Sequence, residues 1–218
     1  MASNRRWRWP FRCRGSRRES AVAQLFSLDQ LAHAMTPTLA ALQKFDAAHQ
    51  NDAVKLSDCG LLLLRPPERA WCDDTPKNGH IFAHTGGDSV HFCLLEIDGR
   101  LNDESPVVMV VPCNSDAPRL VVGDSPREFL ALGCTIGYFF LEQLVYDFDK
   151  TLGYLFDYEA FIRYNYMGKE PPLEDVEDLA ARRALLAALS KKFSLRPWTD
   201  ARSRFDSLQK KWASKVEV

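Results

Sequence analysis

The chain lacks the patterns that mark membrane proteins, disulfide-rich domains and nucleotide-binding enzymes. It has no stretch of about 18 apolar residues, so we expect no segment to span a membrane. Its six cysteines are scattered without a C-x-x-C pair, and a chain of 218 residues does not need disulfides for stability. Neither a P-loop nor a G-x-G-x-x-G motif occurs. We therefore expect reduced thiols, a cytoplasmic location and no cofactor.

The charge of the chain is unevenly distributed, although its composition is that of an ordinary globular protein. The net charge is only -1, yet residues 1–20 hold seven arginines and a single acid, Glu19. The rest of the chain therefore carries 21 basic and 28 acidic residues. We expect a disordered basic tail with at most weak affinity for nucleic acid, and an acidic body suited to a basic partner.

The clearest structural signals lie between residues 81 and 147. Gly86-Gly87 stands between two apolar runs and predicts a two-residue hairpin turn, because both glycines can adopt positive φ. Asp88 is then best explained by the hydrogen bonds of that turn. The run Val107–Val111 predicts a strand covered on both faces. Ser125-Pro126-Arg127-Glu128 predicts a helix start with a capping box.

Weaker signals complete the fold. They predict a strand at 60–64 that ends at Arg65-Pro66-Pro67, a strand at Leu120–Val122, a helix at 28–50 that Pro37 kinks or divides, a helix at 174–192, and a last helix capped by Thr199. We therefore expect an α+β fold, with a mainly antiparallel central sheet, flanking helices and a helical C-terminal extension. The expected parts are a basic tail (1–20), an α+β domain (21–160) and the extension (161–218).

A two-residue turn fixes the expected register of the hairpin. Thr85 then opposes Asp88, Phe82 opposes His91, and His80 opposes Cys93. Because side chains alternate between the faces of a sheet, the hairpin would have a polar face and an apolar core face. The polar face would carry His80, Phe82, His84, Ser89, His91 and Cys93, and the core face Ile81, Ala83, Val90, Phe92 and Leu94.

Two kinds of enzyme chemistry remain open from these residues. His80, His84, His91 and Cys93 would share one face, and zinc accepts imidazole and thiolate ligands, so a metal-dependent enzyme is the alternative interpretation. A helix-covered or polar sheet face explains the same residues without a metal. Cys134 could serve as a nucleophile, but no histidine partner can be assigned to it, and a buried core thiol is the favoured interpretation.

Three segments of the chain resemble the SUKH superfamily. They are IFAHTGGDSVHFCLLE at 81–96, PVVMVVP at 106–112 and VGDSPREFLALGC at 122–134, within a match over roughly residues 55–147. The chain departs from the usual pattern in lacking a clear Trp-Gly motif and in its C-terminal extension. The resemblance implies a binding module: bacterial members are commonly immunity proteins that neutralise polymorphic toxins, and a eukaryotic branch resembles signalling and regulatory scaffolds.

We therefore expect a non-catalytic protein-binding module that contacts its partner through the sheet face, adjoining loops and acidic patches. An acidic body could complement a basic nuclease surface and accelerate encounter. The residues expected to contact the partner are Asp73, Asp74, His84, Asp88, His91, Glu174 and Asp175.

Overall fold

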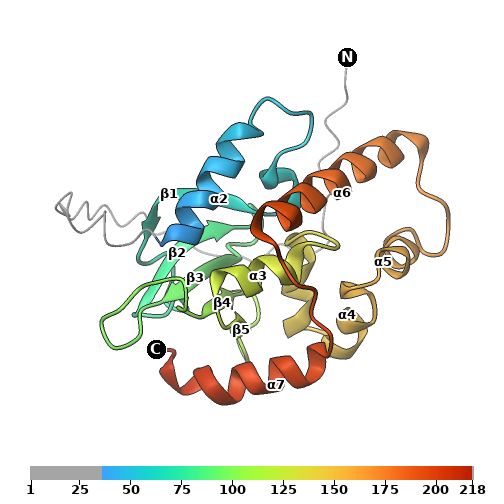
Figure 1. Cartoon of the computed structure of the whole chain (residues 1–218). Coiled ribbons are helices and arrows are strands. Elements are labelled where there is room, and N and C mark those ends of the chain that lie inside the picture. The colour runs from blue at the N-terminus through green and yellow to red at the C-terminus, as the bar shows by residue number, and fades with distance from the viewer. Residues whose placement is uncertain (1–35, 218) are drawn as a thin grey trace.

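The protein is built on a five-stranded antiparallel sheet whose strands are neighbours in chain order (Figure 1). The structure is a computed structural model that describes residues 36–217. The sheet is a simple meander, because antiparallel neighbours can be joined by short hairpin connections. Its strands are β1 (Leu62–Glu68), β2 (Gly79–His84), β3 (His91–Leu95), β4 (Val107–Val110) and β5 (Arg119–Gly123).

Helices precede and follow the sheet in the chain. The α-helices are α2 (Pro37–Ala48), α3 (Pro126–Gly133), α4 (Phe148–Leu155), α5 (Tyr158–Asn165), α6 (Leu173–Phe193) and α7 (Ala201–Trp212). Short 3-10 helices are η1 (Leu56–Cys59), η2 (Phe139–Val145) and η3 (Ala213–Lys215). The predicted α+β class, antiparallel sheet and C-terminal helical extension are confirmed.

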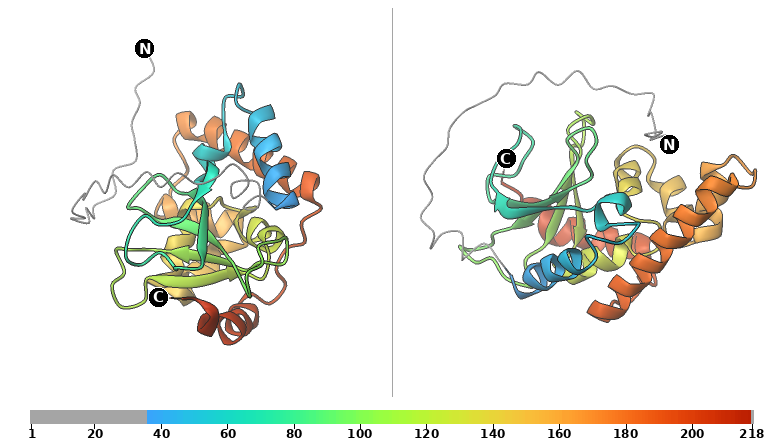
Figure 2. Two further views of the ribbon diagram at one scale, coloured as in Figure 1. Left: turned by 90° about the vertical axis from the view of Figure 1, so that its left-hand side faces the viewer. Right: turned by 90° about the horizontal axis from the view of Figure 1, so that it is seen from above.

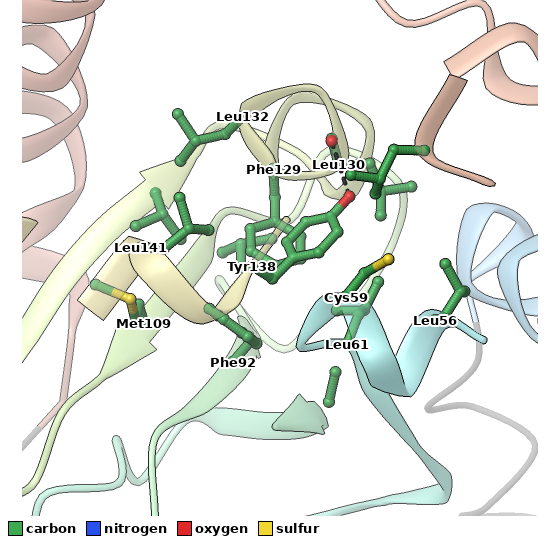
Figure 3. Close-up of a cluster of buried hydrophobic side chains, with 14 of the residues drawn as sticks. Leu56, Cys59, Leu61, Phe92, Met109, Phe129, Leu130, Leu132, Tyr138 and Leu141 are labelled. Carbon is green, nitrogen blue, oxygen red and sulfur yellow. Dashed lines mark hydrogen bonds between the residues drawn. The ribbon is translucent and has the colours of Figure 1, made fainter. Parts of the chain in front are cut away.

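The larger hydrophobic core lies between one face of the sheet and α2, α3 and α6. Its centre is aromatic: the Phe129 ring lies 4.7 Å from that of Phe92 and 5.2 Å from that of Tyr138. Tyr138 is fully buried, and its hydroxyl donates to the carbonyl of Leu130 at 2.9 Å (Figure 3). Gly133 makes room for this ring, since a Cβ there would lie 2.2 Å from it. Helix α3 ends at Gly133.

Helix α7, near the C-terminus, packs beside β5 on the other face of the sheet (Figure 1). Leu208 of α7 is fully buried against a second cluster that includes Cys93 and Val110. Gln209 fixes the helix to the edge strand β5, because its side chain accepts from the Val121 amide at 3.1 Å and donates to the Val121 carbonyl at 2.8 Å. Helix α7 therefore covers part of the face that was predicted to contact a partner, and the partner contact stays a prediction.

The hairpin between β2 and β3 differs from its predicted register. Its loop is longer than two residues, since the amide of Thr85 pairs with Val90 and His84 opposes His91. In the loop, Gly86, Asp88 and Ser89 have positive φ, whereas positive φ was predicted for Gly86 and Gly87. Residues 86–88 nevertheless form the turn, as predicted.

An irregularity between Ile81 and Ala83 also changes which side chains share a face. Ile81 opposes Cys93 and belongs to the second cluster, while Phe82 packs on Phe129 in the main core. For each of these two residues, the predicted face of the sheet is the opposite of the observed one. The exchange buries a large aromatic side chain in the main core, which stabilises the fold by about 2 kcal/mol relative to exposure.

Other helix and strand boundaries differ from the predicted ones by a few residues, for local reasons. Helix α2 starts at Pro37 with Thr36 as its N-cap, so Pro37 begins a helix, and the predicted segment 28–35 lies outside the described residues. Strand β1 runs through Pro66 and Pro67 to Glu68, which an edge strand tolerates because one side of it needs no ladder hydrogen bonds. Asp200, rather than Thr199, caps α7.

Candidate interaction surface

The three histidines of the hairpin have separate structural partners. Nε2 of His80 lies 2.9 Å from a carboxylate oxygen of Glu96. His84 accepts a hydrogen bond from the Gly86 amide at 3.1 Å. His91 is fully buried; its Nδ1 donates to the Ser89 carbonyl at 2.7 Å, and its Nε2 lies 3.0 Å from the Thr75 hydroxyl. These bonds hold the hairpin and the preceding loop in place.

The predicted four-ligand face therefore does not assemble. Cys93 is fully buried among the aliphatic side chains of the second cluster. Within residues 36–217, no group of three or more His, Cys, Asp or Glu side chains is arranged to hold a metal ion. Burial lowers the pKa of His80, His84 and His91 alike, which favours neutral imidazoles that serve as hydrogen-bonding groups.

Of the described cysteines, Cys59 and Cys93 are buried, and Cys72, Cys113 and Cys134 are half-buried. Cys59, Cys72, Cys93 and Cys134 are free thiols, as expected, whereas Cys113 is disulfide-bonded, contrary to the expectation. Burial raises the pKa of Cys134 to about 12, so its thiol stays protonated at neutral pH and is a poor nucleophile. The favoured interpretation of Cys134 as a buried core thiol agrees with this environment.

A groove of about 900 Å³ lies between α3, α7 and the segment that joins α6 to α7. Four of its charged groups, Asp124, Glu128, Arg204 and Lys211, pair with one another. Arg204 donates to both carboxylate oxygens of Glu128, at 2.5 and 2.9 Å, and also contacts Asp124. Lys211 and the indole of Trp212 add further donors to Asp124. This network attaches α7 to the start of α3.

The acidic residues predicted to contact a partner lie in three separate places. Asp73 and Asp74 lie in the loop before β2, where Arg119 approaches the Asp74 carboxylate to 3.5 Å. Asp175 lies in the first turn of α6 together with Glu174, and it accepts a hydrogen bond from the Tyr166 hydroxyl at 3.0 Å. Asp88 is exposed in the hairpin loop. Only the last of these places combines exposed acid with an exposed aromatic side chain.

We call that place the hairpin edge and define it by Asp88, Glu142 and Tyr146. The hairpin loop supplies Asp88, and η2 and its C-cap supply Glu142 and Tyr146. The loop between β4 and β5 supports η2 there, because the Asn114 side chain donates to the Val145 carbonyl at 2.8 Å. Tyr146 is 51% exposed, among the most exposed large hydrophobic side chains of the described residues.

Electrostatics couple the three side chains. Partial burial, and to a smaller extent the negative charge of Asp88, raise the pKa of Glu142 to about 7, while a hydrogen bond from Gln143 opposes the shift. Burial together with the charges of Glu142 and Asp88 also raises the pKa of Tyr146. The groups that shift Glu142 include no cation. The hairpin edge thus holds two like-charged carboxyl groups beside an exposed phenol ring.

Two of these three residues were not predicted from the sequence. Glu142 and Tyr146 lie in a largely apolar segment with no local signal of a binding role. Their significance depends on the approach of Asp88, which is distant in the chain. The Gly-Gly-Asp turn was the available signal, and it identified Asp88 alone.

Comparisons with known protein families, with curated proteins and with solved structures found no match for this chain. Within the described part of the chain, none of the helices combines the length and the apolar character needed to cross a membrane. The arrangement of the residues is therefore the basis on which a function can be proposed.

Proposed function

We propose that this chain is a non-catalytic protein-binding module that recognises a basic protein partner through the hairpin edge. The observation that carries the proposal is the exposed Tyr146 ring beside the carboxyl groups of Asp88 and Glu142. A tyrosine provides a large contact area at low conformational cost, and tyrosines are enriched among the residues that dominate binding energy.

A cationic side chain of the partner fits this surface for two physical reasons. It would neutralise the repulsion between Asp88 and Glu142, which adds to burial in raising the pKa of Glu142. An arginine could at the same time stack on the Tyr146 ring and pair with a carboxylate. The acidic character of residues 21–218 would also accelerate encounter with a basic protein at low salt.

Within this class, the resemblance to the SUKH superfamily supports an immunity protein or an adaptor as the specific role. An immunity protein would cover a basic toxin such as a nuclease, for which an acidic recognition surface is suited. The proposal keeps Asp88 as a contact residue and replaces the buried His91 with Glu142 and Tyr146. A cytoplasmic location belongs to the same proposal.

Site-specific photo-cross-linking tests the proposal. A photoreactive phenylalanine analogue replaces Tyr146 in one version of the chain and Tyr164 in another, each expressed in the cells of origin. Tyr164 is the matched control, because it is an exposed tyrosine (43%) on α5, outside the hairpin edge. We expect one protein to be captured from position 146 and not from position 164.

The captured protein must then bind the chain through electrostatic contacts with the hairpin edge. The purified protein should bind the chain more weakly as salt is raised, and binding should be lost in D88K and in E142K. Equal capture from both positions, or affinity indifferent to these charge reversals, would refute the proposal.

A further inference from the structure

Helix α6 has two halves with different surroundings. In its C-terminal half, Leu185, Leu186, Leu189 and Phe193 are buried in the main core. In its N-terminal half, none of the described side chains before Leu185 is buried, and this half reaches away from the sheet (Figure 2). The helix is thus anchored at one end and projects at the other.

The surface of α6 opposite its buried side is largely apolar along its whole length. We call this surface the outer face and define it by Leu173, Val176, Glu177, Ala180, Ala184, Ala187, Ala188 and Lys191, all of which are exposed. Leu173 is 88% exposed and Val176 is 45% exposed. A helix that buries one face usually carries charged residues on the other, so an apolar outer face indicates that a second surface covers it.

The outer face follows a heptad pattern. Residues 173, 177, 180, 184, 187 and 191 are spaced alternately by four and three, which is the spacing of a coiled-coil seam. The alanines at the middle of this seam would allow another helix to approach closely. Ala184 lies at its centre, one heptad after Glu177 and one heptad before Lys191.

Charge makes this face complementary to itself. Exposed Glu177 lies in the N-terminal half, and exposed Arg183, Lys191 and Lys192 lie in the C-terminal half. When two copies of the helix cross antiparallel at Ala184, each Glu177 meets Lys191 of the second copy, and each Ala180 meets Ala188 of the second copy. A parallel pair would instead place Glu177 against Glu177 and Lys191 against Lys191.

We propose that the outer face of α6 binds a second copy of this chain, as an antiparallel helix pair with a two-fold axis at Ala184. A two-fold axis uses the same surface on both copies, which is the commonest arrangement in homodimers. The proposal goes beyond the binding function proposed above and shares no residue with the hairpin edge. A helix of 21 residues is about 30 Å long, so the interface is small and we expect a dimer in the micromolar range.

Charge reversal combined with mixing tests the proposal on the full chain. The E177K variant has lysine at both charged positions of the seam, and the K191E variant has glutamate at both positions. We expect sedimentation equilibrium to show a monomer–dimer equilibrium for the wild type, and dimer dissociation constants raised about 30-fold in each reversed variant. An equimolar mixture of the two variants, and the double variant E177K/K191E, should dimerise as the wild type does.

Matched reversals on α7 provide the controls, because Asp206 and Lys210 are exposed on a different helix. D206K and K210E should leave dimerisation unchanged. Circular dichroism shows whether each variant is folded, and the restored dimer in the mixture excludes misfolding as the cause of monomers. A monomeric wild type at millimolar concentration, or reversed variants that still dimerise, would overturn the proposal. Neither result would affect cross-linking from position 146, so the two proposals fail separately.

Discussion

The hairpin edge and the outer face of α6 are both exposed, but they differ in how their charges are arranged. The hairpin edge gathers carboxyl groups of one sign, Asp88 and Glu142, beside the ring of Tyr146. The outer face carries both signs, Glu177 at one end and Lys191 at the other, separated by alanines. A surface of one sign needs a different molecule to neutralise it, whereas a surface with two opposed halves can be neutralised by its own copy.

The two surfaces also differ in how they are built. The hairpin edge joins a loop to a 3-10 helix that is distant in the chain, so its geometry depends on the tertiary fold. The outer face lies on one continuous helix, so its geometry follows from helical periodicity. Changes at one surface should therefore leave the other unaffected, which is the basis of the predictions below.

The largest effect is expected for A184R. The substitution places two arginines against each other at the proposed two-fold axis, where bulk and like charge both oppose contact. We expect the dimer dissociation constant to rise about 100-fold or more, measured by sedimentation equilibrium. S207R on the exposed surface of α7 is the control and should have no effect. If A184R also abolished binding of the captured partner, the two surfaces would not be separate.

A smaller effect, confined to partner binding, is expected for Y146A. Removing the exposed ring should weaken binding of the captured protein about 30-fold, the loss typical of an interface hot spot. Y164A is the control on α5. Calorimetric titration measures the affinity, and sedimentation should show unchanged dimerisation. Equal losses for both substitutions would contradict the role assigned to the hairpin edge.

The smallest effect is expected on stability, for E142Q. Because the folded pKa of Glu142 is raised from 4.5 to about 7, the folded state binds more protons than the unfolded state between these values. Wild-type stability should therefore fall as pH rises from 4.5 to 7 and stay lower above pH 7. E142Q lacks this loss, so its stability relative to wild type should increase between pH 4 and pH 8. We expect an increase of about 2 kcal/mol, less than the full pKa shift would give, because Glu142 is partly exposed and solvent screens its charge.

Urea denaturation at the two pH values measures this difference. Q143E is the comparison variant, because it adds a carboxyl group beside Glu142 and removes the hydrogen bond that lowers its pKa. It should deepen the loss of stability above pH 7. Parallel pH profiles for E142Q and wild type would show that Glu142 does not titrate near neutrality.

The parts of the fold set by local chemistry were predictable from the sequence. Ser125 caps α3 as its capping-box pattern predicts, although Glu128 accepts from the Asp124 amide rather than from that of Ser125. Val107–Val110 is buried on both faces, as its unbroken apolar run indicates. In both cases the interaction lies within a few residues or depends on hydrophobicity alone.

The parts set by distant contacts were not predictable. The irregularity in β2 between Ile81 and Ala83 directs Phe82 into the main core, where it packs on Phe129. No local sequence pattern encodes that contact. Both His91 and Asp88 were predicted as contact residues, yet the loop before β2 covers His91 through Trp71 and Thr75, whereas Asp88 is exposed in the hairpin loop. The candidate site was therefore identified only in part, at Asp88.

The pKa of Glu142 shows most directly whether the hairpin edge holds an unneutralised pair of carboxyl groups that a cationic partner completes. Carbon-13 NMR of the side-chain carboxyl, with E142Q for assignment, measures it in the free chain and in the complex with the captured protein. We predict a pKa of about 7 in the free chain and a clear decrease in the complex, because a nearby cation stabilises the carboxylate. A pKa near the ordinary 4.5 in the free chain, or no change on binding, would contradict the claim.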